Sequence, residues 1–189
     1  MDIHVAKAAD GQHVLTWNGT SVRCAVGRTG IRLDKREGDG GTPVGAFTLR
    51  RVLYRADRLV PPVTGLPISV INRDDGWCDD PAHPDYNRPI KLPFAASREE
   101  LWLDSLVYDI IVILGHNDAP PVPGMGSAVF FHLTDADYRP TAGCVAVQLS
   151  DMLPILAAAK PGDRMVIAPS PQAMAACDPA GGRGPECLL

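Results

Sequence analysis

The side chains best suited to chemistry lie between residues 130 and 147, in the sequence FFHLTDADYRPTAGCVAV. One apolar run ends at His132, and a second begins directly after Cys144. Short apolar runs bounded by polar and turn-forming residues predict strands, so the imidazole ends one strand and the thiol begins another. Neighbouring strands are about 4.8 Å apart, which brings such a pair within reach of each other. A base beside a thiol activates it as a nucleophile, so we expect a Cys-His acyl-transfer site.

Small residues directly precede this cysteine. Gly143 leaves room beside the sulfur, and the backbone N–H groups at Gly143 and Cys144 can bind an oxyanion. Most free cysteines in strands are small buried hydrophobic residues, and most single histidines are satisfied residues of the surface or the core. The spacing of His132 and Cys144 therefore leaves a structural interpretation open beside the catalytic one.

Length and composition indicate one folded domain, which we place at residues 1–168, followed by a peripheral tail at residues 169–189. The net charge of −4 and the pI of about 5.7 give no support for nucleic acid as a partner. No apolar run approaches the roughly 18 residues that a transmembrane segment needs, and the first residues show no secretory signal.

The five cysteines are Cys24, Cys78, Cys144, Cys177 and Cys187. Their odd number leaves at least one thiol free in a monomer, and Cys144 is our candidate for it. Cys177 and Cys187 are placed so that a disulfide between them would close a loop in the tail. Cys78 lies near a histidine and several aspartates, but these lack the paired spacings of zinc sites, so we expect no metal.

Strand-like patterns dominate the chain. The clearest are residues 13–17, 22–26, 46–49, 108–114, 129–131, 145–147 and 164–168. Asn18-Gly19 favours a tight hairpin turn between the first two. The sequence YDIIVIL, at residues 108–114, is almost continuously apolar and therefore predicts a central strand.

Two short helices are also predicted. Ser97 followed by Glu100 forms a capping box, which indicates a helix through about residue 103, and a second helix begins at Ser150. The balance of strands and helices predicts a mainly β protein. We expect a small β-sandwich or barrel-like sheet with two short helices and long proline-rich loops.

Proline-rich loops surround the predicted site. The prolines of residues 60–93 argue against a central strand or a long helix and predict an extended loop that shapes a cleft. The glycine-rich loop at residues 35–45 matches no phosphate-binding motif, so we interpret it as a structured turn. A structural role remains the alternative for each polar residue in these loops. The residues expected to contact substrate are Trp77, His116, Asn117, Tyr138 and Thr141.

Residues 22–168 resemble the L,D-transpeptidases of the YkuD type. Three features carry the resemblance: DGGTPVGAF at residues 39–47, similar to the family segment T-P-x-G-x-F; the strand ending in Phe131-His132; and TAGCV at residues 141–145, similar to the signature [S/T]-H-G-C-hydrophobic. The order of these features and the flanking strands also match. The resemblance implies a mainly β catalytic domain that works through a cysteine acyl-enzyme.

The resemblance also assigns roles to individual residues. Cys144 corresponds to the nucleophile and His132 to the base, and Gly143 and Cys144 would contribute backbone groups to the oxyanion site. A backbone carbonyl just after the histidine, here that of Leu133, would orient the imidazole. No metal and no organic cofactor is implied.

The substrates follow from the same resemblance. It implies peptidoglycan stem peptides as donor and acceptor, carbapenem β-lactams as inhibitors, and a location in the periplasm or cell wall. The pattern GHNDAPPVPG…H…GCVA is similar to a divergent proteobacterial branch associated with 1,3 cross-links, which join L-Ala to diaminopimelate. Two positions depart from the family: Ala142 replaces a histidine, and Ala146 replaces an asparagine or arginine.

Three other functions are compatible with these residues. A carboxypeptidase or endopeptidase on the same scaffold would use water in place of the acceptor amine. A non-catalytic module that binds the cell wall would keep the fold and lose the reaction, and a thiol redox or metal protein is the third possibility. In a transpeptidase, acidic side chains would attract the acceptor ammonium group; the candidates are Asp79, Asp118, Asp135 and Asp137.

Overall fold

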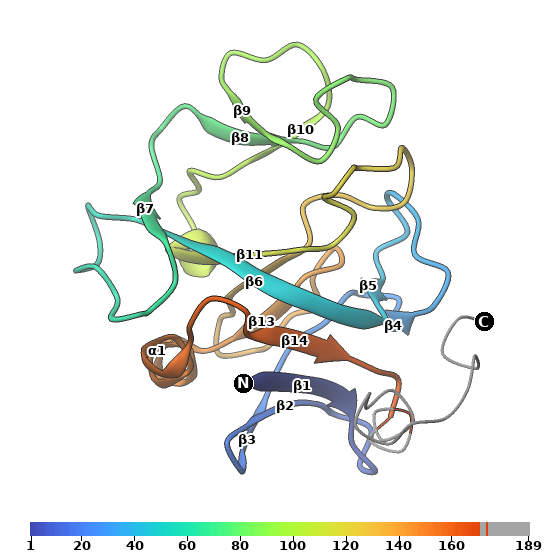
Figure 1. The fold of residues 1–189 in the computed structure, drawn as a ribbon, viewed down its shortest axis with the longest axis vertical. Helices are drawn as coiled ribbons and strands as arrows, with labels where there is room; N and C mark the ends of the chain where they lie inside the picture. The colour runs from blue at the N-terminus through green and yellow to red at the C-terminus, as the bar shows by residue number, and fades with distance from the viewer. Residues whose placement is uncertain (171–172, 174–189) are drawn as a thin grey trace.

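The computed structural model describes residues 1–170 and residue 173 (Figure 1). The predicted pairing of Cys177 with Cys187, and nearly all of the predicted tail, lie outside the described residues. The strands of the described part are β1 (Asp2–Lys7), β2 (His13–Trp17), β3 (Thr20–Arg23), β4 (Ile31–Arg32), β5 (Thr42–Pro43), β6 (Gly45–Tyr54), β7 (Ile68–Val70), β8 (Asp75–Cys78), β9 (Pro89–Lys91), β10 (Arg98–Glu100), β11 (Ile110–Leu114), β12 (Phe130–Leu133), β13 (Val145–Val147) and β14 (Arg164–Ile167).

Nine strands form the main sheet, in the order β13-β12-β11-β6-β14-β1-β2-β3, with β7 beside β6. The two ends of this order are joined beyond β3, where Ala25 and Ala146 exchange backbone hydrogen bonds of 2.8 and 2.9 Å. The sheet is therefore nearly closed into a barrel, which confirms the predicted mainly β fold. The expected strand at residues 22–26 ends early, at Arg23, because the chain then crosses from β2 to β13.

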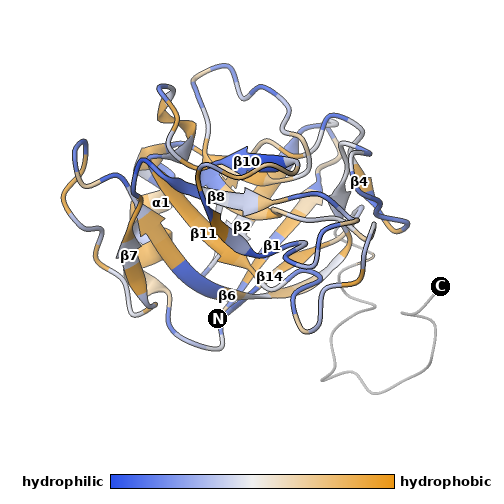
Figure 2. Ribbon diagram, turned by 90° about the horizontal axis from the view of Figure 1, so that it is seen from above, coloured by the Kyte–Doolittle hydropathy of each residue, from blue (hydrophilic) through white to orange (hydrophobic). Residues whose placement is uncertain are grey.

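Strand β11 lies between β6 and β12, as its apolar sequence predicts. Its side chains alternate between two cores: Ile110, Val112 and Leu114 face the interior of the barrel, whereas Ile111 and Ile113 face a second hydrophobic cluster. Burial on both faces explains why the strand shows no alternation of polar and apolar residues. Figure 2 shows β11 as largely hydrophobic and β10 as hydrophilic.

A separate three-stranded sheet, in the order β10-β8-β9, covers the second cluster (Figure 1). The helix predicted from Ser97 and Glu100 is wrong, because residues 98–100 form strand β10 and pair with β8. A capping box contributes little when no apolar helical stripe follows it, and pairing with a neighbouring strand satisfies the same backbone groups. The side chain of Glu99 therefore has the direction that a strand gives it, and not the one that the predicted helix would give it.

The helix predicted from Ser150 is present as α1 (Leu149–Ala158). A short 3-10 helix, η1 (Leu106–Tyr108), leads into β11, so the predicted strand at residues 108–114 begins two residues late. Between β2 and β3, Asn18 and Gly19 have φ angles of 45° and 77°, as the predicted hairpin turn requires. Within the described residues, no helix combines the length and apolar character needed to cross a membrane.

Candidate active site

Strands β12 and β13 bring the histidine and the cysteine together. They pair in parallel, with Phe131 opposite Val145 and His132 opposite Ala146. Cys144 directly precedes β13 and lies beside Phe130, whose backbone N–H donates to the Cys144 sulfur at 3.3 Å. The thiol donates in turn to the carbonyl of Ala128, also at 3.3 Å. The predicted adjacency of the two strands is therefore present.

The imidazole of His132 is held by its own strand. Its Nδ1 lies 2.8 Å from the carbonyl oxygen of Leu133, the contact that the sequence resemblance implies. A carbonyl only accepts hydrogen bonds, so Nδ1 carries the proton and Nε2 of the neutral ring has a free lone pair. Tyr108 packs edge-on against the ring, with 5.1 Å between ring centroids. The free nitrogen is the one that can act as a base.

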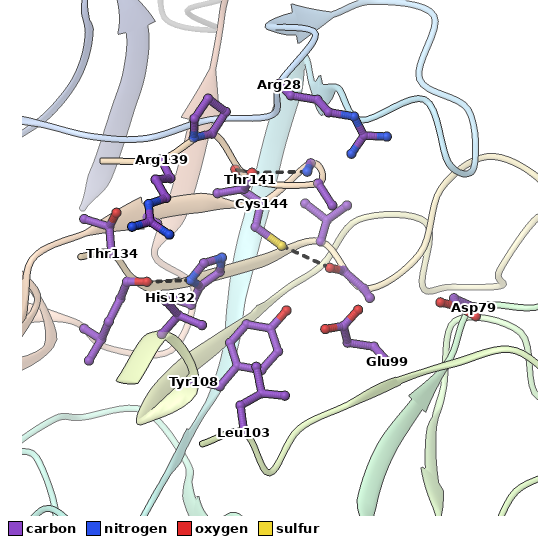
Figure 3. Close-up of a pocket in the computed structure, with 18 of the residues that line it drawn as sticks. Arg28, Asp79, Glu99, Leu103, Tyr108, His132, Thr134, Arg139, Thr141 and Cys144 are labelled. Carbon is purple, nitrogen blue, oxygen red and sulfur yellow. Dashed lines mark hydrogen bonds between the residues drawn. The ribbon is translucent and has the colours of Figure 1, made fainter. Parts of the chain in front are cut away.

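Both groups open into a cavity of about 580 Å³ (Figure 3). Figure 3 shows the imidazole of His132 and the thiol of Cys144 projecting into it from neighbouring strands. The side chains are nonetheless nearly covered, with exposed fractions of 6% for His132 and 7% for Cys144. A substrate carbonyl would reach the sulfur from this cavity.

Burial sets the protonation states of the pair. Loss of solvation raises the pKa of the Cys144 thiol to about 12, and the negative charge of Glu99 adds to this rise. A hydrogen bond from Phe130 and the charge of Lys35 oppose the rise only partly. Loss of solvation also lowers the pKa of His132 to about 4, although the carbonyls of Leu133 and Val107 favour the protonated ring. The resting site therefore holds a neutral thiol and a neutral imidazole rather than a preformed ion pair.

The depressed pKa of His132 links stability to pH. The unfolded chain binds a proton at the ordinary pKa of 6.5, whereas the folded chain resists protonation down to about pH 4. The free energy of unfolding should therefore fall by ~3 kcal/mol as the pH drops through this window. Urea unfolding of the parent and of His132→Gln would test this, because the variant should lose this component of the pH dependence. Parallel curves for the two proteins would contradict it.

The carbonyl of Cys144 is anchored by two hydroxyl groups. Thr141 Oγ1 donates to it at 2.7 Å and Thr42 Oγ1 at 3.1 Å, while the backbone N–H of Gly27 donates to Thr42 at 2.8 Å. Thr42 belongs to the glycine-rich segment, so this segment is attached directly to the cysteine. The N–H of Gly143 donates to Thr141 Oγ1 at 3.1 Å. Its predicted place in the oxyanion site requires that this bond open, and that role stays a prediction.

Replacing Thr42 with valine should loosen this attachment. The change removes one donor to the Cys144 carbonyl and leaves the buried Gly27 N–H without its acceptor, which costs about 1–3 kcal/mol. Thermal or urea unfolding would measure the loss. Thr16→Val is the control, because the Thr16 hydroxyl bonds the exposed Ser21 hydroxyl and not a buried backbone group of the described residues. Equal, negligible effects of the two substitutions would contradict the anchoring role of Thr42.

Nearly the whole described chain matches a known family of catalytic domains. Residues 4–167 match the L,D-transpeptidase catalytic domain, YkuD. The chain belongs to this family. The resemblance drawn from the sequence is thereby confirmed for the L,D-transpeptidase family. No curated protein matches the chain.

Three solved structures show a distant similarity. The helical cell shape determining protein Pgp2 from Campylobacter jejuni is 12% identical, with a TM-score of 0.42 over 89% of this chain and 47% of that one. An L,D-transpeptidase from Mycobacterium smegmatis is 12% identical, with a TM-score of 0.39 over 88% and 58%. L,D-transpeptidase 1 from Mycobacterium tuberculosis is 11% identical, with a TM-score of 0.34 over 88% and 60%. The chain thus spans about half to three fifths of these proteins.

Charged side chains of both signs line the cavity of this L,D-transpeptidase-family chain. They are Arg28, Lys35 and Arg139 together with Glu37, Asp79, Glu99 and Asp135. Figure 3 shows the two arginines on the far side of the thiol from Glu99, whose carboxylate faces the hydroxyl of Tyr108. Burial raises the pKa of Glu99, and the Tyr108 hydroxyl opposes this by hydrogen bonding to the carboxylate. The Oδ1 atom of Asp79 is buried without a hydrogen-bond partner among the described residues.

Some residues predicted to contact substrate line this cavity and others do not. Thr141 does. His116 lies outside, with Nε2 3.0 Å from the carbonyl of Met125, and Asn117 binds the backbone of its own loop. Trp77 donates to Asn87 and packs on the second core, and Tyr138 lies under Arg23. A substrate contact by these four stays a prediction.

Of the four acidic residues predicted to attract the acceptor ammonium group, two line the cavity and two do not. Asp79 and Asp135 line the cavity, whereas Asp118 and Asp137 are not part of its lining. Asp118 pairs with Arg50, and Arg139 lies near both Asp135 and Asp137. Among residues 1–170 and 173, no group of three or more histidine, cysteine or acidic side chains is arranged to hold a metal ion.

Sequence reasoning does not single out several residues of the site, among them Lys35, Glu99 and Tyr108. The sequence pattern predicts Tyr108 as the first residue of a strand and Glu99 as part of a helix. Lys35 gave a weak signal, because it opens the same glycine-rich loop that carries the family's T-P-x-G pattern. All three come from segments distant in sequence from Cys144.

Proposed function

We propose that the protein is a peptidoglycan L,D-transpeptidase that cross-links stem peptides through a thioester on Cys144. The observation that carries the proposal is the pairing of β12 with β13, which places the Cys144 thiol and the His132 imidazole in one cavity. Membership of the L,D-transpeptidase family supports stem peptides as the substrate class. The same membership supports the cell wall as the place of action.

The first half of the reaction acylates the cysteine. Nε2 of His132 takes the thiol proton as the sulfur attacks the peptide carbonyl on the C-terminal side of an L-centre. The resulting oxyanion is stabilised by backbone N–H groups at Gly143 and Cys144. Collapse of the tetrahedral intermediate breaks the C–N bond, and the imidazolium returns its proton to the leaving amine. The product is a thioester.

The second half transfers the acyl group to an amine. The acceptor amine attacks the thioester carbonyl, His132 accepts the proton that the amine loses, and the Cys144 sulfur leaves and is reprotonated. The acceptor arrives as an ammonium group, which Glu99 and Asp79 attract at their side of the cavity, and it releases one proton to solvent before the free amine attacks. This acidic side supports an amine acceptor over water, and thus transfer over the carboxypeptidase or endopeptidase reaction.

The donor is proposed to be the L-Ala residue at the first position of the stem, joined to the side-chain amine of diaminopimelate. This 1,3 assignment depends on the GHNDAPPVPG…GCVA pattern of the sequence. Arg28 and Arg139, opposite Glu99, suit the carboxylates that follow L-Ala in the stem.

The test is product analysis with purified protein and defined stem peptides. Cross-linked dimers formed with an acceptor present would support transfer, and the mass of the donor fragment would separate 1,3 from 3,3 products. Shortened monomers alone would indicate hydrolysis. Binding to isolated cell walls without any product would instead support the non-catalytic module.

Replacing Glu99 with glutamine should weaken acceptor binding. The change removes a half-buried negative charge but keeps the shape of the side chain, so the KM for the acceptor amine should rise about tenfold. Acylation in the absence of acceptor should not slow, because the loss of the Glu99 charge removes one cause of the raised pKa of the Cys144 thiol. Glu100→Gln is the matched control, because the neighbouring Glu100 is exposed and pairs with Arg98. Identical acceptor KM values for the parent and Glu99→Gln would contradict the role of Glu99.

A further inference from the structure

Lys35 is a buried cation in the glycine-rich loop. Its exposed fraction is 7%, and a lysine is rarely buried to this extent unless its charge is paired. Its Nζ donates to Asp39 Oδ1 at 2.6 Å and to the carbonyl of Arg36 at 2.8 Å. An ammonium group has three N–H donors, and the third has no acceptor among the described residues. One donor is thus free for a group that enters the cavity.

This ammonium lies next to the nucleophile. A Cβ atom placed on Gly143 would be 3.7 Å from Lys35 Nζ, so the charge stands beside the residue that directly precedes Cys144. Lys35 and Cys144 also line the same cavity. The carbonyl of Gly41 would be only 2.9 Å from the same Cβ position. A side chain at position 143 would therefore separate the loop and its lysine from the cysteine.

The reaction needs a positive charge at this point. His132 is neutral at rest, and the N–H of Gly143 is bonded to Thr141. Positions 142 and 146, where the family carries polar side chains, are alanines that line the cavity. A negative charge forms first on the sulfur and then on the substrate oxygen, and neither can be left without a partner in a buried site.

The two arginines of the cavity are weaker candidates for this task. Arg139 has an exposed side-chain fraction of 76% and lies near Asp135 and Asp137. Arg28 is exposed and donates to the carbonyl of Gly38. Water and salt screen charges at such positions, whereas a charge in a buried site acts at a lower effective dielectric constant.

We propose that Lys35 is the electrostatic partner of the acyl-transfer site, where its ammonium group stabilises the Cys144 thiolate and then the oxyanion of the tetrahedral intermediate. Lys35 keeps all its protons throughout, and His132 carries out every proton transfer. Asp39 fixes the ammonium in place. The inference rests on the proposed function, because it assumes that Cys144 is acylated.

The test measures the reactivity of the thiol, which is independent of any peptidoglycan substrate. Iodoacetamide alkylates thiolates, and peptide mapping would report the rate at Cys144 separately from the other cysteines. Other charged or titratable groups around the pair are unchanged in the single variants of Lys35; they are Glu37, Asp39 and His116 near Lys35, and Glu99, Tyr108 and His132 near Cys144.

Lys35→Met keeps the length of the side chain and removes its charge. We expect the rate of Cys144 alkylation at a fixed alkaline pH to fall about tenfold, which corresponds to a rise of about one unit in the thiol pKa. The rate of acylation by a donor peptide should fall about 10- to 100-fold. Lys35→Arg, which keeps the charge, should retain most of both rates.

A double variant separates this role from a structural one. In Lys35→Met/Asp39→Asn the ion pair becomes a neutral pair, so the Asp39 carboxylate no longer remains after its nearer cation has been removed. Arg32, 4.0 Å from Asp39, is the same in both variants. The alkylation defect should persist in the double variant even where its melting temperature recovers. Recovery of the parent alkylation rate in the double variant, or an unchanged rate in Lys35→Met, would overturn the inference. A Cys144 that is unreactive in the parent at every pH would overturn the proposed function itself, and the inference with it.

Discussion

Replacement of Cys144 with alanine should abolish cross-linking and prevent any covalent adduct with a carbapenem. Cys144 is the proposed site of the thioester, so the rate should fall by about 10⁴-fold or more. Intact-mass spectrometry after incubation with the drug would show a single adduct on the parent and none on Cys144→Ala. The fold should survive, because the sulfur makes only two weak hydrogen bonds, to Phe130 and Ala128.

The control for this experiment is Cys24→Ala. Cys24 is also buried, and burial likewise raises the pKa of its thiol to about 12, but it lies in the core of the barrel rather than in the cavity. This variant should keep the adduct, apart from any loss caused by reduced stability. If the parent forms no adduct, iodoacetamide would show whether the drug is merely excluded. Adduct formation in Cys144→Ala would contradict the assignment of the nucleophile.

The second large effect concerns His132. His132→Gln keeps a hydrogen-bonding side chain of similar size but removes the base, so the acylation rate should fall by about 10²- to 10⁴-fold. The pH profile of the parent carries a sharper prediction. Because burial lowers the pKa of His132 to about 4, activity should persist below the ordinary histidine pKa of 6.5 and disappear only as the pH falls through about 4.

The sign of this effect follows from the role of the base. Only the neutral ring can accept the thiol proton, so activity requires a pH above the pKa of His132 in the folded protein. Steady-state rates measured from acidic to neutral pH would locate the acidic limb of the pH profile, which is the pH range in which activity falls. A limb near pH 6.5 would mean that the imidazole is solvated in the working enzyme. His13→Gln, a change in strand β2 outside the cavity, should leave both the rate and the limb unchanged.

Local patterns in the sequence were sufficient for several parts of the molecule. The apolar run at residues 108–114 predicted the central strand, and Asn18-Gly19 predicted a hairpin turn. The runs that end at His132 and begin after Cys144 predicted two strands, and these strands are neighbours. Such features depend on a few adjacent residues, whose side-chain periodicity or φ preference specifies one conformation.

The same kind of reasoning failed where pairing with a distant segment decided the structure. Ser97 and Glu100 have the spacing of a helix cap, yet residues 98–100 are a strand because β8 lies beside them. A capping preference is worth roughly 1 kcal/mol, and cross-strand pairing with burial outweighs it. The same pairing brings Glu99 into the cavity.

The sequence by itself identified the family and predicted His132 and Cys144 as the reactive pair. Only the tertiary structure decided what surrounds the pair: Thr42 on the Cys144 carbonyl, Tyr108 against the imidazole, and Lys35 beside Gly143. These residues reach the site because the sheet closes and the glycine-rich loop folds onto β13. The shifted pKa values of Cys144 and His132 could not be predicted from the sequence either. They depend on burial, which is a property of the folded chain and not of any local motif.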